Sequence, residues 1–275
     1  MRSSRARRCL ASVSVAVAAV CLAVPGAYAA DIEPTAAGKY VALGDSYAVA
    51  PGTREYDNPD DPCRRGPSTY PRLWAQQHPS YSFVEASCSG ATTADLTNQQ
   101  VPQLTADTTL VTVHVGGNDV GFVDVLKNCI LTIDDKDCIA GVEAAKAAAT
   151  SSLPGALAST YAAIRAKAPN AKVVVVGYPR LYTIGGTCGI LGLSDRERTA
   201  LNSGSDTLDS VLASEAGKAG FTFLDPRTAF DPHTICSKGQ AWVTSLEWEK
   251  INESYHPNKA GHSEGYLPLL NAITG

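Results

Sequence analysis

Four short groups of small and polar residues in this sequence have the types that nucleophilic catalysis requires. In chain order they are Gly44-Asp45-Ser46-Tyr47, Ser89-Gly90-Ala91, Gly116-Gly117-Asn118-Asp119 and Tyr255-His256-Pro257. A serine hydroxyl becomes a good nucleophile when a neighbouring base takes its proton, and an imidazole can do so near neutral pH. Attack on a carbonyl carbon then places negative charge on the carbonyl oxygen, which N–H groups can stabilise.

Short apolar, β-branched runs alternate along the chain with longer stretches of helical pattern. The runs that predict strands are residues 39–44, 81–86, 109–115, 172–177 and 221–224. The stretches that predict helices are residues 70–77, 142–167 and 194–217, with a break at Pro154 and a last helix beginning at Pro257. The alternation predicts an α/β fold with a mostly parallel five-stranded sheet and helices on both faces.

The polar groups fall where such a fold forms its site. Ser46, Gly90 and Asn118 each lie in a loop after a predicted strand, and His256 precedes the last predicted helix. Because ligands bind at the carboxyl ends of the strands in open α/β sheets, we expect these loops to meet at that edge.

At these residues the sequence resembles the GDSL, or SGNH, hydrolases. Residues 44–47, Gly90, residues 116–119 and His256 are similar to the four sequence blocks of that family and occur in its order. The resemblance extends from about Tyr40 to His262, and the cysteines after residue 30 resemble those of the family's secreted bacterial lipases and esterases. It implies a flavodoxin-like three-layer α/β/α fold and ester hydrolysis through an acyl-enzyme.

The resemblance and the chemistry together suggest a role for each block. We expect Ser46 to be the nucleophile and His256 the general base. We expect the oxyanion hole to consist of the main-chain N–H groups of Ser46 and Gly90 and the side-chain amide of Asn118. Asp45 and Asp119 are expected to shape their loops. Without the other blocks, residues 44–46 or 116–119 would be interpreted as ordinary turns.

The base is chosen from five histidines. His78 ends a predicted helix and is expected to be solvated, whereas His114 lies within a predicted strand and is expected to pack inside. His262 lies two turns beyond His256 in the last predicted helix. His233, on a loop, remains an alternative to His256.

A second serine motif competes with Ser46. Residues 261–265 match the G-x-S-x-G nucleophile elbow of α/β-hydrolases, with Ser263 at its centre. That elbow needs a strand before it and a histidine after it, but here a predicted helix precedes it and no histidine follows. We interpret the match as coincidental.

The group that orients His256 has two candidates. The family usually has an aspartate three residues before its histidine, and this chain has Glu253 there. Some relatives use a main-chain carbonyl instead, which here would be that of Ser254. Because glutamate is one methylene longer than aspartate, we favour the carbonyl, and both candidates stay open.

Six cysteines follow residue 30, and an even number in an exported chain favours three disulfides. No C-x-x-C motif or clustered Cys/His spacing indicates a metal site. Six cysteines permit 15 pairings. We expect the sequential one because each loop then joins segments that the predicted fold brings together: Cys63–Cys88, Cys129–Cys138 and Cys188–Cys236.

Residues 1–30 have the features of a signal peptide. Four arginines precede an apolar run of 16 residues from Cys9 to Val24, which is short of the roughly 20 needed to span a bilayer. Ala27-Tyr28-Ala29 then offers a small-x-small cleavage site. We expect this segment to be removed, which leaves residues 31–275 as one secreted, extracellular hydrolase domain. A retained membrane anchor is the alternative.

The charge of the chain excludes some partners. The formal net charge is −4, and loss of residues 1–30, with four arginines and no acidic residue, would make it −8. Such a chain without basic clusters has no electrostatic basis for binding nucleic acid. We expect a monomer that needs no cofactor and no metal.

Lipid esters, including phospholipids, are the expected substrates, with transient contact to lipid aggregates. Residues 184–193 (IGGTCGILGL) could receive an acyl chain, or could be a buried loop held by Cys188. A carbohydrate deacetylase of the same fold is one alternative. A non-catalytic binding module is another, although a binder has no need of both Ser46 and His256.

Overall fold

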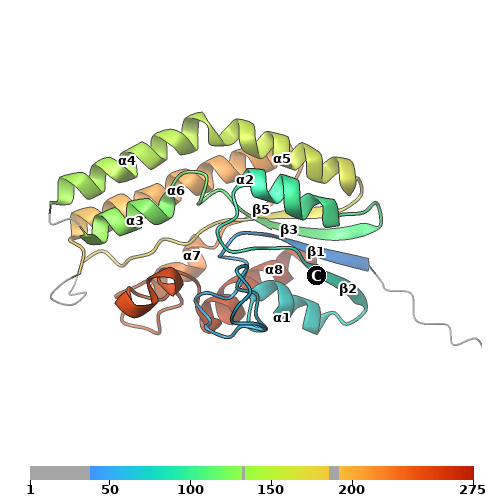
Figure 1. The fold of residues 1–275 in the computed structure, drawn as a ribbon, viewed down its shortest axis with the longest axis horizontal. Coiled ribbons are helices and arrows are strands. Elements are labelled where there is room, and N and C mark those ends of the chain that lie inside the picture. The colour runs from blue at the N-terminus through green and yellow to red at the C-terminus, as the bar shows by residue number, and fades with distance from the viewer. Residues whose placement is uncertain (1–37, 132–133, 186–191) are drawn as a thin grey trace, which may run out of the picture. The chain divides into compact units, whose positions relative to one another are not determined.

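Five short apolar strands form the central sheet of this computed structural model, which describes residues 38–131, 134–185 and 192–275 (Figure 1). They are β1 (Gly38–Gly44), β2 (Tyr81–Glu85), β3 (Thr108–His114), β4 (Lys172–Val176) and β5 (Thr222–Leu224). All neighbouring pairs are parallel, and the order is β2-β1-β3-β4-β5. The predicted parallel five-stranded sheet is confirmed.

Alternate residues of each strand face opposite sides of the sheet, so each face carries its own apolar core. Tyr40 and Ala42 belong to one core and Val41 and Leu43 to the other. Helices α1 (Tyr70–Gln77) and α8 (Leu267–Thr274) cover the first face, and α5 (Leu153–Lys167) and α6 (Asp195–Lys218) cover the second (Figure 1). The expected three-layer α/β/α architecture is therefore confirmed.

Two helices extend the second layer beyond the sheet. Helix α4 (Asp135–Ser151) packs on α6, and α3 (Phe122–Leu131) packs on α4. The shorter helical segments are α2 (Thr93–Asp95), η1 (Leu96–Gln100), η2 (Val101–Gln103), α7 (Arg227–Phe230), η3 (Asp231–His233), η4 (Trp248–Glu253) and η5 (Gly261–Tyr266). Among the described residues, no helix is both long and apolar enough to cross a membrane.

Helix boundaries differ from the prediction at two places. The stretch predicted at 142–167 begins at Asp135, because Asp134 caps it by accepting a hydrogen bond from the N–H of Lys136. It divides at Ser152, next to the predicted break. The last helix does not begin at Pro257, which pairs with Val243 in an isolated bridge. The side chain of Asn258 instead caps it by accepting from the N–H of Gly261.

Two of the three expected disulfides lie within the described residues. Cys63 is bonded to Cys88, and Cys129 to Cys138. Cys236 also forms a disulfide. Cys188 lies outside the described residues, as do residues 1–30, for which a signal peptide is predicted.

Candidate active site

The turn that follows β1 presents Ser46 at the carboxyl edge of the sheet. The N–H of Asp45 donates to the carbonyl of His114 at the end of β3, over 2.8 Å. The Asp45 side chain accepts from the N–H of Tyr47 over 2.9 Å, which closes an Asx turn around the serine. Ser46 is 8% exposed and lines a cleft.

Ser46 and His256 are hydrogen-bonded although 210 positions separate them: Nε2 of the imidazole lies 2.8 Å from the serine Oγ. Thr244 holds the main chain of the histidine through two hydrogen bonds. The Thr244 Oγ1 accepts from the N–H of His256 over 3.1 Å, and the Thr244 N–H donates to the carbonyl of His256 over 2.9 Å. Tyr255 just before it has a left-handed backbone with φ +63°, which turns the chain toward the serine.

Burial keeps the imidazole in the form that can accept a proton. It lowers the pKa of His256 to about 4, because a charged imidazolium loses its hydration inside the protein. The nearby main-chain carbonyls of Ser254 and Glu253 oppose this shift of the pKa, and so does the Glu253 carboxylate. At neutral pH the imidazole is therefore uncharged and suited to act as a base.

The two candidates for orienting His256 have different surroundings. The Glu253 carboxylate accepts a hydrogen bond from the Tyr56 hydroxyl over 2.8 Å and forms an ion pair with Arg54 at 3.3 Å. The Ser254 carbonyl has the largest effect of any neighbour in favouring protonation of His256. No described residue meets full hydrogen-bond geometry at Nδ1 of His256. The Glu253 carboxylate is therefore engaged with residues other than His256.

The three expected oxyanion donors line the same cleft as Ser46 and His256. Among the described residues, the main-chain N–H groups of Ser46 and Gly90 donate to no protein acceptor. Gly90 has φ +82°, a conformation that strains any residue with a Cβ. One hydrogen of the Asn118 amide goes to the carbonyl of Ala91 over 3.0 Å, which fixes the amide and leaves its other hydrogen for a ligand.

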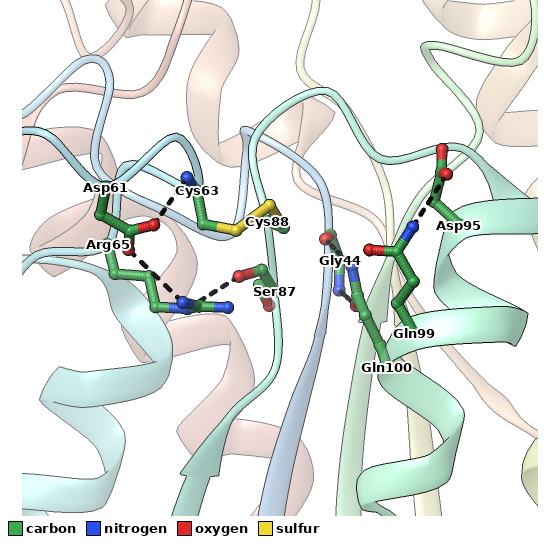
Figure 2. Close-up of a disulfide and its surroundings, with 9 residues drawn as sticks. All are labelled: Gly44, Asp61, Cys63, Arg65, Ser87, Cys88, Asp95, Gln99 and Gln100. Carbon is green, nitrogen blue, oxygen red and sulfur yellow. Dashed lines mark hydrogen bonds and ion pairs between the residues drawn. A yellow bond between two sulfur atoms is a disulfide. The ribbon is translucent and has the colours of Figure 1, made fainter.

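A disulfide and a salt-bridged arginine tie the Gly90 loop to the loop after β1. Figure 2 shows Cys63–Cys88 beside Arg65, whose Nε donates to the carbonyl of Ser87 over 3.1 Å. The N–H of Ser89 also donates to the carbonyl of Cys63 over 3.2 Å. These contacts fix the main chain immediately before Gly90.

A buried glutamine fixes the end of β1. The Gln100 side chain accepts from the N–H of Gly44 over 2.8 Å and donates to its carbonyl over 2.9 Å (Figure 2). Gln100 is 3% exposed, so these bonds are shielded from water. The strand end that carries Ser46 is thus held by a side chain from η1.

Asp45 and Asp119 both contact loops of the protein, as expected. Burial raises the pKa of Asp45 to about 7, and the carboxylate accepts a hydrogen bond from the Tyr178 hydroxyl over 2.5 Å. The same hydroxyl accepts from the N–H of Gly117 over 3.2 Å, so Tyr178 links the turn that carries Ser46 to the Asn118 loop. Asp119 accepts from the N–H and hydroxyl of Thr93.

The cleft above Ser46 has a volume of about 300 Å³ and one strongly apolar wall. This wall comes from one face of α3 and consists of Phe122, Val123, Leu126 and Ile130. The Cys129–Cys138 disulfide ties α3 to α4. The segment expected to receive an acyl chain, 184–193, lies partly outside the described residues, which exclude 186–191. Its described residues do not line this cleft.

The other four histidines do not line the cleft with Ser46. His114 and His262 are fully buried, and the His262 Nδ1 accepts a hydrogen bond from the N–H of Tyr70. His233 stacks on Trp242 at 3.8 Å, and His78 stacks on Trp74 at 3.9 Å. His78 is half-buried, so it is only partly solvated.

The competing serine motif at 261–265 is helical. Gly261 lies against the main chain of Trp242, and Gly265 lies against the ring of Phe230, so a side chain at either position would clash. Its glycines therefore serve helix packing. The interpretation of this match as coincidental agrees with the structure.

Sequence reasoning did not find Thr244, Tyr178, Gln100 or the apolar face of α3. The first three act through bonds to residues far away in the chain, for which a single sequence carries no signal. The spacing of Phe122, Leu126 and Ile130 is a helical signal that could have indicated α3. Among the described residues, no group of three His, Cys, Asp or Glu side chains could hold a metal ion.

Comparison with known proteins adds an independent line of evidence. Residues 42–263 match the model of the GDSL-like lipase/acylhydrolase family. The chain is 45% identical to lipase 1 of Streptomyces coelicolor over 98% of this chain and 99% of that protein. It resembles the crystal structure of phospholipase A1 from Streptomyces albidoflavus with a TM-score of 0.82 and 49% identity, over 86% of this chain and 98% of that one. The chain also resembles the crystal structure of an extracellular lipase from Streptomyces rimosus, with a TM-score of 0.82 and 41% identity, over 86% of this chain and 100% of that one.

Proposed function

Because the chain belongs to the GDSL-like lipase/acylhydrolase family, and is thus a carboxylic ester hydrolase, we propose that it cleaves lipid esters with Ser46 as nucleophile and His256 as general base. The observation that carries the proposal is the 2.8 Å hydrogen bond between Ser46 Oγ and His256 Nε2 at the base of an apolar-walled cleft.

The first half of the reaction forms an acyl-enzyme. Ser46 Oγ attacks the ester carbonyl carbon while Nε2 of His256 takes the hydroxyl proton. Negative charge on the carbonyl oxygen is stabilised by the N–H groups of Ser46 and Gly90 and by the Asn118 amide. The C–O bond of the ester then breaks, and His256 returns the proton to the leaving alcohol.

The second half of the reaction releases the fatty acid. Water enters the place of the alcohol, His256 takes its proton, and the resulting hydroxide attacks the acyl-serine carbonyl. Collapse of the intermediate breaks the bond between the acyl carbon and Oγ of Ser46 and returns the proton to Oγ. In both halves the Ser254 carbonyl orients the imidazole and stabilises the imidazolium.

The apolar face of α3 supports a lipid substrate. An acyl chain laid along Phe122, Leu126 and Ile130 would remove apolar surface from water, which favours binding by about 25 cal/mol per Å². A sugar acetyl ester would leave this wall exposed. The names of the similar proteins, lipase and phospholipase A1, agree with this substrate class.

The test combines active-site variants with a series of acyl lengths. Ser46→Ala, His256→Ala and the double variant are assayed on 4-nitrophenyl acetate, hexanoate and decanoate. Because the two residues act as one unit, each single variant should lose nearly all turnover and the double variant little more. A serine-directed phosphonate should label the wild type and not Ser46→Ala.

Three outcomes would oppose the proposal. Turnover of Ser46→Ala within tenfold of wild type would remove Ser46 from the mechanism. Preference for acetyl over medium-chain esters would favour a carbohydrate deacetylase. Absence of labelling and turnover in the folded wild type would favour a non-catalytic binding module.

We also propose that residues 1–30 are a cleaved signal peptide and that residues 31–275 act outside the cell as a monomer. The disulfides support an oxidising compartment. A similar protein is described as an extracellular lipase. N-terminal sequencing of the protein from culture medium would test the cleavage and the secretion. Its mass under native conditions would test the monomer.

A further inference from the structure

Two basic side chains reach the cleft of this acidic protein. Arg64 comes from the loop after β1 and Lys127 from α3, and both line the cleft with Ser46, Asn118 and His256. Both side chains are half-buried. The whole chain has a net charge of −4, so two cationic side chains in the substrate cleft differ in sign from the protein as a whole.

The acidic groups of the same cleft do not compensate these cations. Asp45 is buried, with its carboxylate bonded to Tyr178 and to the N–H of Tyr47. Glu253 is bonded to Tyr56 and paired with Arg54. Among the described residues, neither Arg64 nor Lys127 lies within ion-pair distance of a carboxylate. The two cations of the cleft are therefore left without an ion-pair partner, so an anionic group of a ligand can pair with them.

Arg64 is held in place before any ligand arrives. Its main chain has φ +56° and is bonded through its N–H to the carbonyl of Asp61 and through its carbonyl to the N–H of Ala50. Its guanidinium lies 5.2 Å from the centre of the Tyr56 ring. Tyr56 is itself fixed by its bond to Glu253. A guanidinium fixed in this way loses less entropy when it binds an anion.

Lys127 adjoins the apolar wall. It follows Leu126 and lies one turn after Val123 and just under one turn before Ile130, all on α3. Asp124, three residues earlier, is exposed, does not line the cleft and forms no ion pair with Lys127 in the described part of the chain. A ligand whose acyl chain lies along α3 would thus have the ammonium of Lys127 beside it.

We propose that Arg64 and Lys127 bind the phosphate group of a glycerophospholipid while its acyl ester lies at Ser46. This inference rests on the proposed function and narrows its substrate class. A phospholipid combines acyl chains for the α3 wall with a phosphodiester a few bonds from the scissile ester, and guanidinium and ammonium groups suit phosphate oxygens. Water cleaves the carboxylic ester to a fatty acid and a lysophospholipid, and the phosphodiester stays intact.

The test compares two substrates that differ in their headgroup. Dihexanoylphosphatidylcholine and dihexanoylglycerol have the same acyl chains, and both are used below their aggregation concentrations so that no lipid surface contributes. The variants are Arg64→Met, Lys127→Met and the double variant. Each replaces a cationic side chain with an unbranched apolar one and so removes the charge. The ratio of kcat/KM on the phospholipid to kcat/KM on the diacylglycerol is measured for each.

The double variant should lower this ratio at least tenfold and each single variant at least threefold. The control is Lys167→Met, which removes one exposed cation at the end of α5, at the opposite edge of the sheet, and should leave the ratio unchanged. Added NaCl should lower the ratio of the wild type more than that of the double variant. Salt screens the attraction between the phosphate and the two cations, and the double variant lacks this attraction.

An unchanged ratio in the double variant would overturn this inference while hydrolysis of dihexanoylglycerol still supports the ester hydrolase. If neither substrate is cleaved by the folded wild type, the proposed function itself fails. Inhibition of dihexanoylglycerol hydrolysis by millimolar inorganic phosphate, lost in the double variant while the ratio stays unchanged, would assign the two cations to free phosphate and overturn the headgroup assignment.

Discussion

The hydroxyl of Tyr47 donates a hydrogen bond to the main-chain carbonyl of Tyr255 over 2.6 Å. The residue after Ser46 is therefore bonded to the residue before His256. Both tyrosines are buried, and the Tyr47 ring also packs against the His256 ring with 5.4 Å between centres. This bond supports the left-handed conformation of Tyr255, which a non-glycine residue adopts only at a cost.

Tyr47→Phe should therefore lower kcat about tenfold and leave KM nearly unchanged. Loss of the hydroxyl leaves the Tyr255 carbonyl without its donor and lets the His256 loop relax, and such a bond contributes about 1 kcal/mol. Steady-state kinetics per folded molecule would measure the effect. Tyr161→Phe is the matched control, because the buried Tyr161 hydroxyl has no partner among the described residues. Equal kinetic effects of the two variants would contradict a positioning role for Tyr47.

Asn118→Ala should lower turnover by roughly 10²–10³-fold, because it removes one donor to the developing oxyanion. KM should change little, since that charge is present mainly in the transition state. The fold should persist, because Asn118 faces a cleft. Asn271→Ala, which removes an amide bonded to Gln77, is the control. Unfolding of Asn118→Ala with normal turnover per folded molecule would make Asn118 a structural turn residue.

Glu253→Ala should retain turnover within about tenfold of wild type. The carboxylate contacts Tyr56 and Arg54, and the proposed orienting group is the Ser254 carbonyl. Tyr56→Phe removes the hydrogen bond between the Tyr56 hydroxyl and the Glu253 carboxylate, and it should cause a similar small loss of turnover. A decrease of several orders of magnitude in Glu253→Ala alone would assign the orienting role to the carboxylate.

The acid limb of kcat/KM against pH should lie near pH 4. Only neutral His256 can accept the serine proton, and burial lowers its pKa from 6.5 to about 4, so activity is lost as pH falls through that lower value. At pH 5.5 most activity should remain, whereas a histidine of ordinary pKa would be only about one-tenth neutral. Circular dichroism at each pH would verify that the protein stays folded. A midpoint near pH 6.5 would contradict the assigned environment of His256.

Residues 31–275, denatured without reduction, should contain no free thiol. Cys63–Cys88 and Cys129–Cys138 account for four cysteines, and Cys236 is also disulfide-bonded. The expected third bridge, Cys188–Cys236, would account for the rest. Titration with a thiol reagent should give zero thiols before reduction and six after it. Two or more before reduction would refute the three-bridge arrangement.

The sequence by itself determined the parallel sheet and the order of its loops. β-branched runs such as 172–177 are signals within a few residues, and alternation of strands and helices restricts the topology to a parallel sheet. Once the sheet is parallel, loops after successive strands must meet at one edge. For that reason the amino-acid sequence alone was enough to predict that Ser46, Gly90 and Asn118 lie together.

Only the tertiary structure decided how these residues are held and what borders them. The contacts of Tyr47 with Tyr255, of Tyr178 with Asp45 and of Thr244 with His256 join segments remote in sequence. Directional hydrogen bonds of this kind depend on ångström-scale placement of whole elements, which local propensity and periodicity do not encode. The same reason left the orienting group of His256 open in the sequence, because the partners of the Glu253 carboxylate are set by the loop that carries Arg54 and Tyr56.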